Sequence, residues 1–292
     1  MSILVNKDTC LIIQGITGKY GEFYCQANGE YGTKIVGGTS PGKGGQEVHG
    51  IPVYNSLKEA QRRTRIDASI VWVPGPFAKI AVFEAIDAEI GLIICPVDGI
   101  PVKDSMLIMR KLKDSKSILI GPNTPGIITP GQFVAGFMPP HAFSPGPVGI
   151  ASRSGTLTYQ IGSLLTKAGV GQSTSLGIGG DPIVGFNFIQ ALQEFEADTD
   201  TKIIILICEI GGSQEEMAAD FIKKNISKPV LCFIGGRMAQ NGTRMGHAGA
   251  IISGKYGSFE SKLKAFKDAD VPVAELLTEL PDMVINMLNR KR

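Results

Sequence analysis

His247 is the residue of this sequence whose type and surroundings point most directly to chemistry. It lies in a glycine-rich segment, residues 235–250, with small neighbours that leave the imidazole accessible. Imidazole is a nucleophile at neutral pH. Arg237 and Arg244 in the same segment are cations that could meet a phosphate. A chemical role is therefore one interpretation of His247, and a structural histidine is the other.

Glu209 is a second candidate, because it directly follows the apolar run that ends at Cys208. A carboxylate at the end of a buried strand lies at the edge of a crevice. There it either caps the next helix or orients a partner such as histidine. No set of His, Cys and acidic residues has the spacing of metal ligands, so the sequence predicts no metal site.

Two glycine-rich loops in the first half of the chain have the composition of phosphate-binding loops. Residues 15–21 have the spacing GxxGxxG after an apolar run. This would place backbone N–H groups and a helix N-terminus beside a phosphate, and a tight turn without ligand is the alternative. Residues 37–45 carry Lys43 where an NAD site would have an acid. That favours an extra phosphate, as on NADP or coenzyme A (CoA), with a solvated lysine as the alternative.

A similar feature occurs in the second half of the chain. The apolar run 147–151 leads into Ser154-Gly155-Thr156, where we expect a helix to begin. Serine and threonine are good N-caps, and the N–H groups of the first turn favour an anion. A phosphate site and a plain capped helix are both compatible with this pattern.

The elements that must position these residues follow from the hydrophobic pattern. Short apolar runs alternate with amphipathic segments, which predicts an α/β protein with parallel sheets. We expect strands at 10–14, 34–37, 68–73, 91–95, 117–120, 147–151, 174–178, 202–208, 229–234 and 271–274. We expect helices at 19–30, 56–63, 77–88, 103–113, 156–168, 185–195, 213–224, 258–268 and 278–290. Residues 121–147 are rich in Pro and Gly and indicate a boundary. The predicted division is a domain of residues 1–124, a linker of 125–146 and a domain of 147–292.

Composition excludes several classes of protein. The formal net charge of +2 fits neither a strongly basic nucleic-acid binder nor an acidic disordered chain. No run of about 18 apolar residues occurs, so no membrane span is predicted. The five cysteines form no CxxC pair, and the N-terminus has no features of a signal or transit peptide. Together they predict a cytoplasmic protein.

Seven strings of residues carry a resemblance to a known family. They are Gln14–Gly18, Tyr31–Lys34, Pro41–Gly45, Ser152–Tyr159, Gly177–Pro182, Glu209–Gly212 and Arg244–Ala250. The strings occur in family order over nearly the whole chain. Together they resemble alpha subunits of succinyl-CoA synthetase, the NDP-forming succinate–CoA ligase.

The resemblance implies an N-terminal Rossmann-like CoA-binding domain followed by a C-terminal flavodoxin-like domain. It also implies a beta subunit with an ATP-grasp domain that binds Mg and ATP or GTP, in an αβ or (αβ)2 assembly. The implied reaction is a step of the tricarboxylic acid cycle. It forms succinyl-CoA from succinate, CoA and a nucleoside triphosphate, releasing NDP and phosphate, and proceeds through a phosphohistidine. Phosphorylating an imidazole splits one difficult transfer into two.

The same resemblance implies roles for individual residues. His247 would be phosphorylated, Glu209 would orient its imidazole, and Tyr159 would lie near the acid substrate. The helix that begins at residues 154–156 would hold the phosphate. The residues that would contact CoA are Thr17, Gly18, Lys19, Tyr20, Lys43, Pro96, Val97 and Asp98.

Four departures from the family pattern keep alternatives open. Asp98 and Gln160 stand where Glu is common, Thr124 stands where Cys is common, and residues 238–241 replace the usual Ala-Pro-Lys-Gly. None of them removes the histidine, but a ligase for malate or citrate remains an alternative. A non-catalytic CoA-binding regulator and an NADP-dependent oxidoreductase are alternatives of other classes, although the oxidoreductase lacks an evident catalytic set.

Overall fold

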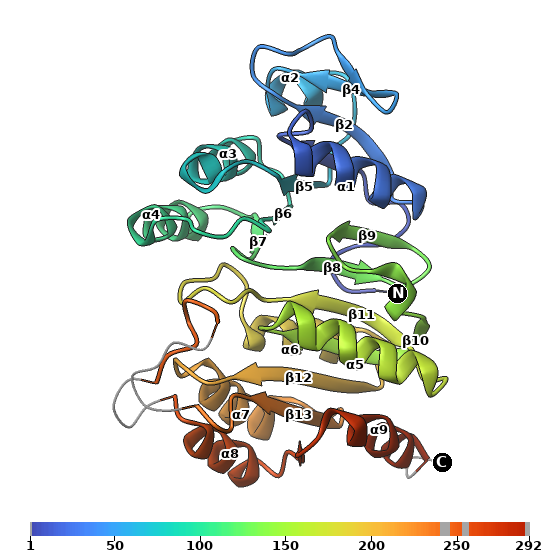
Figure 1. Ribbon diagram of the computed structural model, residues 1–292, viewed down its shortest axis with the longest axis vertical. Helices are drawn as coiled ribbons and strands as arrows, with labels where there is room; N and C mark the ends of the chain where they lie inside the picture. Colours follow the sequence, from blue (N-terminus) through green and yellow to red (C-terminus); the bar gives the residue numbers. More distant parts are fainter. Residues whose placement is uncertain (1, 240–245, 253–256, 290–292) are drawn as a thin grey trace.

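The computed structural model describes residues 2–239, 246–252 and 257–289 of the chain. Within them, strands and helices alternate and build two mainly parallel sheets. The sheets follow each other along the long axis of the molecule (Figure 1). The prediction of an α/β protein is confirmed, because short buried apolar runs form strands and the longer amphipathic segments form helices.

The first sheet has the strand order β3-β4-β2-β1-β5-β6-β7. Its strands are β1 (Leu11–Gln14), β2 (Ile35–Thr39), β3 (Glu47–Val48), β4 (Ile51–Tyr54), β5 (Ala68–Val71), β6 (Leu92–Ile94) and β7 (Ile118–Ile120). Its helices are α1 (Lys19–Glu30), α2 (Leu57–Gln61), α3 (Gly75–Asp87) and α4 (Val102–Lys113). Among the described strands of this first sheet, only β3 is antiparallel to its neighbour. The parallel strands therefore have the order of a Rossmann sheet, as expected.

The second sheet has the order β14-β13-β12-β10-β11-β8-β9. Its strands are β8 (Gly126–Thr129), β9 (Phe133–Gly136), β10 (Pro145–Ser152), β11 (Gln172–Gly177), β12 (Ile203–Glu209), β13 (Val230–Gly235) and β14 (Val273–Ala274). Its helices are α5 (Gly155–Lys167), α6 (Phe188–Ala197), α7 (Gln214–Asn225), α8 (Phe259–Asp268) and α9 (Leu280–Asn289), with single turns η1 (Pro140–Ala142) and η2 (Leu277–Glu279). The five strands from β10 onward are parallel and have the order of a flavodoxin-like sheet.

Residues 125–146, which the sequence predicts as a linker, are instead part of the second sheet. β8 and β9 form an antiparallel hairpin, and β8 pairs antiparallel with β11. The prolines of this segment lie outside these two strands: Pro125 precedes β8, Pro130 is at the hairpin turn, and the others follow β9. This segment therefore keeps its backbone hydrogen bonds despite its composition. The limits of the two flanking domains remain a prediction.

The β8–β9 hairpin is also bound to the first half of the chain. The Thr33 hydroxyl donates to the backbone oxygen of Val134 over 2.7 Å and accepts from its N–H over 2.9 Å. The side-chain amide of Asn28 donates to the backbone oxygen of Gly136 over 3.2 Å. These contacts are buried, so the hairpin connects helix α1 and its following turn to the second sheet.

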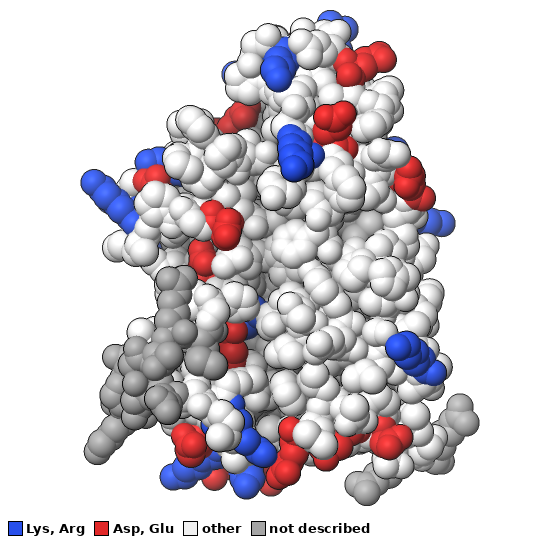
Figure 2. Space-filling view, viewed as in Figure 1, with Lys and Arg blue, Asp and Glu red and all other residues white. Residues whose placement is uncertain are grey.

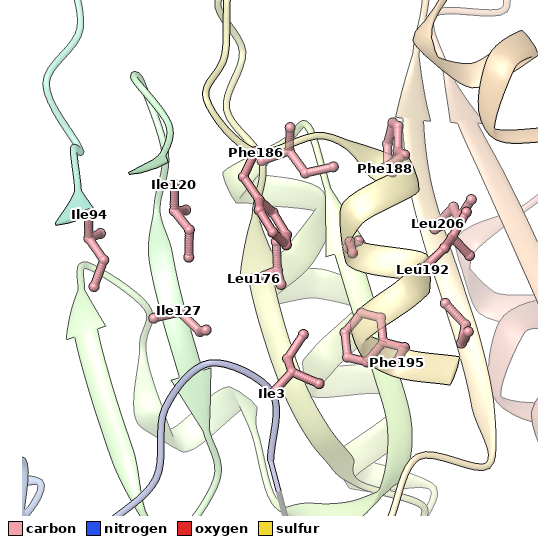
Figure 3. Packing of buried hydrophobic residues seen from close by; sticks show 14 of the residues in the cluster. Ile3, Ile94, Ile120, Ile127, Leu176, Phe186, Phe188, Leu192, Phe195 and Leu206 are labelled. Carbon is pink, nitrogen blue, oxygen red and sulfur yellow. The ribbon is translucent and has the colours of Figure 1, made fainter. Parts of the chain in front are cut away.

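The hydrophobic core continues from one sheet into the other. Ile120 of β7, Ile127 of β8 and Leu176 of β11 belong to one cluster with Phe186, which precedes α6 (Figure 3). The Gly185 N–H also donates to the backbone oxygen of Gly121 over 2.8 Å. An apolar core with few voids resists relative motion. The two sheets therefore hold the loops at their carboxyl ends in fixed positions.

Candidate active site

Each sheet has a position where the strand order reverses, and ligands of open α/β sheets bind outside the carboxyl ends of strands at that point. In the first sheet it lies between β1 and β5, and in the second between β10 and β12. The GxxGxxG loop follows β1 and Trp72 follows β5, while Arg153 follows β10 and Glu209 ends β12. The candidate residues therefore gather at both crevices.

The loop between β1 and α1 has the geometry of an anion site. Gly18 is the N-cap of α1 and supplies no side-chain cap, so the first turn presents its backbone N–H groups. A Cβ on Gly21 would stand 2.2 Å from the backbone oxygen of Gly15. Only glycine therefore allows the helix to begin this close to the strand. The tight turn and the phosphate site, left as alternatives by the sequence, are both compatible with this loop.

Thr17 and Lys43, from two different loops, lie together beside α1. The ammonium group of Lys43 donates to the Thr17 hydroxyl over 3.1 Å, and that hydroxyl is 2.9 Å from the hydroxyl of Ser40. The Lys43 side chain is exposed on its loop. A cation beside uncapped helical N–H groups is suited to a phosphate.

A cavity of about 560 Å³ opens next to this loop. Its lining residues are Gly18, Lys19, Tyr20, Tyr24, Trp72, Val73, Pro74, Gly75, Pro96, Val97, Asp98, Asn123 and Phe137. Six of the eight residues assigned to CoA by resemblance line it, and the other two, Thr17 and Lys43, are adjacent to it. A cavity of this size with apolar walls is suited to a nucleotide-like ligand.

Aromatic side chains form one wall of this cavity, and the sequence analysis missed all but Tyr20. Trp72 stacks on Tyr24 with ring centroids 4.7 Å apart and on Tyr20 with centroids 6.2 Å apart. The indole nitrogen of Trp72 is buried without a hydrogen-bond partner among the described residues. Trp72 is the one tryptophan of the chain and directly follows an apolar strand. Its place after that strand was the sequence signal that could have identified Trp72 as a site residue.

His247 lies at the second crevice and is paired with Glu209. Its Nδ1 is 2.8 Å from Oε2 of Glu209. The loop packs so closely on Gly180 that a Cβ there would stand 2.4 Å from the imidazole ring. The hydrogen bond with Glu209 raises the pKa of His247, and burial and the charge of Arg153 oppose this rise. The structure thus brings together the two residues that the sequence proposed as nucleophile and orienting acid.

A second cavity, of about 390 Å³, contains His247. It is lined by Asp98, Gly99, Ile100, Val102, Ser105, Asn123, Asp181, Pro182, Ile183, Gly246, His247 and Ala248. Asp98 and Asn123 also line the first cavity, so the two cavities adjoin at these residues. The side-chain amide of Asn123 donates to Oδ1 of Asp181 over 3.0 Å. A ligand that begins at the α1 loop can therefore extend toward the imidazole.

The N-terminus of α5 directly follows Arg153 and begins at a side-chain cap. The Ser154 hydroxyl caps the helix by accepting from the Leu157 N–H over 3.4 Å. Within the described part of the chain, Ser154, Gly155 and Thr156 are not among the residues that line the His247 cavity. Arg153, which directly precedes them, lies 3.2 Å from Oε1 of Glu209. A phosphate contact of residues 154–156 therefore remains a prediction.

Tyr159 is not among the residues that line the His247 cavity in the described part of the chain, and its hydroxyl lies beside Gly155 at the start of α5. Tyr159 lies against a small apolar cluster that includes Met138 and Phe143. Its hydroxyl is buried and has no hydrogen-bond partner within the described residues, and burial raises its pKa. Its role beside an acid substrate also remains a prediction.

The departures from the family pattern have different structural settings. Thr124 is fully buried, and its hydroxyl donates to the backbone oxygen of Gly177 over 2.6 Å and accepts from the Gly126 N–H over 3.0 Å. It thus holds the turn before β8. Gln160 and Met238 are exposed. Residues 240–241 lie outside the described residues, as does Arg244.

Arg237, the other predicted phosphate cation, has different neighbours in the structure. Its guanidinium group lies over the ring of Phe259, 5.1 Å from the centroid, and 3.8 Å from a carboxylate oxygen of Glu275. It is not among the residues that line the His247 cavity in the described part of the chain.

Charged side chains are scattered over the surface. On the face shown in Figure 2, charges of both signs are scattered around a broad uncharged area where the two sheets meet. Within residues 2–239, 246–252 and 257–289, no helix is long and apolar enough to cross a membrane. No group of three His, Cys, Asp or Glu side chains in those residues is arranged to hold a metal ion.

Comparison with known families defines the class of protein. A model of the CoA binding domain matches residues 6–99, and a model of the CoA-ligase domain matches residues 151–271. Each matched segment contains one of the two crevices, so fold and site together define a CoA ligase chain. Relatives that align over nearly the whole chain show the family more narrowly.

The succinate–CoA ligase (ADP-forming) subunit alpha 1 of Archaeoglobus fulgidus is 54% identical over 288 residues, which cover 99% of either chain. The corresponding alpha subunit of Aquifex aeolicus is 48% identical and covers 99% of this chain and 95% of its own length. The chain belongs to the family of succinate–CoA ligase alpha subunits.

Solved structures share the fold at lower identity. An ATP citrate lyase of Methanothrix soehngenii in complex with citrate and coenzyme A aligns with a TM-score of 0.87 and 22% identity. The alignment covers 97% of this chain and 51% of that chain, so the present chain spans about half the length of the lyase. An ATP citrate lyase of Methanosaeta concilii aligns with a TM-score of 0.90 at 22% identity. These likenesses concern the fold alone.

Proposed function

We propose that this chain is the phosphohistidine-carrying alpha subunit of an ADP-forming succinate–CoA ligase. The observation that carries the proposal is the pairing of His247 with Glu209, 2.8 Å apart, in a cavity that adjoins the cavity beside α1. His247 supplies a nucleophile, and the cavity beside α1 supplies a place for CoA. The relatives in the family are named succinate–CoA ligases, which supports succinate as the acid.

The Glu209 contact determines which nitrogen of His247 reacts. A carboxylate only accepts hydrogen bonds, so the hydrogen of the neutral imidazole stays on Nδ1. The lone pair is then on Nε2. Nε2 attacks the γ-phosphorus of ATP, the bond to the β-phosphate oxygen breaks, and ADP leaves. Glu209 stabilises the positive charge that develops on the ring.

The phosphoryl group then activates the acid. A carboxylate oxygen of succinate attacks phosphorus, the N–P bond breaks, and succinyl phosphate forms while His247 returns to neutrality. The CoA sulfur, as thiolate, attacks the acyl carbon, and the C–O bond to phosphate breaks. Succinyl-CoA and inorganic phosphate result. Holding the thiol and the histidine at adjoining cavities turns these steps into reactions of neighbouring groups.

A partner belongs to the same proposal. The ATP site and its Mg lie on a beta subunit with an ATP-grasp domain, in an αβ or (αβ)2 assembly. The named relatives are alpha subunits, which supports the need for a partner. The tricarboxylic acid cycle and the cytoplasm are the proposed setting, and fractionation of cells that express the chain would test the location.

Phosphate discharge tests the proposal. The chain is co-expressed with a beta subunit, labelled with γ-labelled ATP, and challenged with CoA plus succinate, malate or citrate. We expect acid-labile phosphate on His247 that succinate plus CoA discharges, and no label in His247→Ala. Discharge by malate or citrate alone would reassign the acid. Absence of label in a stable, nucleotide-binding complex would contradict the proposal and favour a CoA-binding regulator.

A further inference from the structure

Behind Glu209 lies a buried chain of alternating charges that the reaction does not use directly. Arg153 Nη2 is 3.2 Å from Oε1 of Glu209, and Arg153 Nη1 is 3.0 Å from Oε1 of Glu215. The ammonium group of Lys262 contacts the other oxygen of Glu215 and is 3.1 Å from Glu216. Only 5% of the Arg153 side chain is exposed, and neither Glu215 nor Lys262 is exposed.

Such a chain is unusual in a core of this kind. Removing charges from water costs several kcal/mol per ion, and apolar residues of similar volume often stabilise a fold as well or better. The sequence nevertheless places four charges in one line from α8 through α7 to the histidine. At one end Lys262 contacts Glu216, and at the other end Glu209 contacts the imidazole of His247. Stability alone therefore gives no reason for the position of this line.

The cations also hold the backbone that follows Glu209. Arg153 Nη1 donates to the backbone oxygen of Gly211 over 3.1 Å, and Lys262 donates to that of Gly212 over 3.1 Å. Gly211 and Gly212 form the turn after β12. Arg153 thus forms an ion pair with Oε1 of Glu209 and also holds the backbone two residues further on, at Gly211. The remaining carboxylate oxygen of Glu209, Oε2, is directed to His247.

We propose that Arg153 is a positioning residue for the phosphorylated histidine, acting through Glu209, and that Glu215 and Lys262 hold Arg153 in place. The inference deepens the proposed function and rests on it. Arg153 neutralises the side of Glu209 that faces away from the ring. Glu209 can then hold Nδ1–H without drawing a second proton onto the imidazole.

The charges around His247 predict the direction in which its pKa changes when Arg153 is replaced. Glu209 from β12, Asp181 from the loop after β11 and Asp98 from the loop after β6 are the acidic groups at the imidazole. Arg153 is the cation that faces them within the described residues. Glu209 and Asp181 raise the pKa of His247, and Arg153 lowers it. Without Arg153, more of the histidine is imidazolium at neutral pH and unable to attack phosphorus.

The test uses the complex with the beta subunit and the variants Arg153→Met and Arg153→Lys. The rate at which His247 is labelled by γ-labelled ATP is measured against pH. In R153M we expect the rising limb of the profile to move to higher pH and the plateau rate to fall by about tenfold or more. In R153K we expect the limb to keep its wild-type position, because the charge remains, and the plateau to fall, because one ammonium group cannot span both carboxylates.

Arg65→Met is the matched control, because Arg65 forms an exposed ion pair with Asp67 at 2.8 Å. It should leave the profile unchanged. A plateau loss in R153M without movement of the limb would overturn the proposal and leave Arg153 a structural residue. If R153M fails to fold, R153K decides, since a wild-type plateau there overturns the proposal. A wild-type complex that is never labelled would instead contradict the proposed function itself.

Discussion

At the scale of single residues, the proton on His247 decides whether the site can react. Its Nδ1 hydrogen bond to Glu209 selects the tautomer with the lone pair on Nε2, and the same bond raises the pKa of His247. The imidazolium form has no lone pair on either nitrogen. In the proposed reaction Glu209 therefore orients the nucleophile, and its hydrogen bond also makes His247 easier to protonate.

Glu209→Gln separates these two effects. The amide oxygen still accepts from Nδ1, but its charge is gone, so the pKa of His247 should fall toward its ordinary value. The rising limb of labelling against pH should move to lower pH, opposite in direction to R153M. The plateau rate should fall by roughly tenfold or more, because a neutral partner stabilises the charged ring less.

The measurement for this variant is the NMR titration of the histidine ring protons, which gives the pKa without turnover. The chain has three histidines, and His247→Asn identifies the relevant signal. A pKa of His247 in E209Q that stays as high as in the wild type would assign the raised pKa to another group, such as Asp181, whose charge also raises it.

The sequence singled out His247 and Glu209, which the structure pairs, because His247 stands in a glycine-rich segment and Glu209 stands at the end of an apolar run. Arg153 appeared there only as a member of a family string. Its partners Glu215 and Lys262 follow it by 62 and 109 positions in the chain, and no local pattern joins them. Trp72 was missed because an aromatic residue after a strand is equally typical of a core.

At the scale of elements, loops from adjacent strands form the first crevice. The loop after β1 carries Thr17, and the loop after β2 carries Lys43. Because these parallel strands are paired, the ammonium group of Lys43 lies 3.1 Å from the hydroxyl oxygen of Thr17. The N-terminus of α1 begins beside them. An anion at this place would meet a cation, a hydroxyl and helical N–H groups from two elements.

Lys43→Ala tests this arrangement with two ligands. The K43A complex should bind CoA about fivefold more weakly, a loss of about 1 kcal/mol, which is modest because Lys43 is exposed. Dephospho-CoA, which lacks the extra phosphate, should bind wild type and K43A equally. Calorimetric titration of both proteins gives the four affinities. An equal loss with both ligands would place the Lys43 contact on another part of CoA.

Periodicity located most strands and helices within two or three residues, because each buried run or amphipathic face carries its own signal. α1 was predicted at 19–30 and lies there. The β8–β9 hairpin escaped prediction because its strands have four residues each and stand among prolines. Its pairing depends on β11, about fifty residues later in the chain, and on Thr33 from the first half.

At the scale of the whole molecule, the two sheets share one core, and this determines the distance between the two crevices. The sequence indicated a boundary near residue 125, where the composition changes, but it carried no signal of the packing across it. The two halves pack together across that boundary through the side chains of Ile120, Ile127 and Phe186 (Figure 3). Asp98 and Asn123 consequently line both cavities, and the route from the α1 loop to His247 stays intact.

Phe186→Ala tests whether the halves unfold together. Phe186 is buried in the second half of the chain, and its truncation should cost about 3–5 kcal/mol of unfolding free energy. Because the core is shared, denaturant midpoints measured by Trp72 emission, which reports on the first sheet, and by far-UV ellipticity should fall together. Phe77→Ala is the control, since Phe77 is 60% exposed and closer in sequence to Trp72, and neither midpoint should move. A Trp72 midpoint that F186A leaves unchanged would mean that the two sheets unfold independently, and the distance between the crevices would then require the beta subunit to fix it.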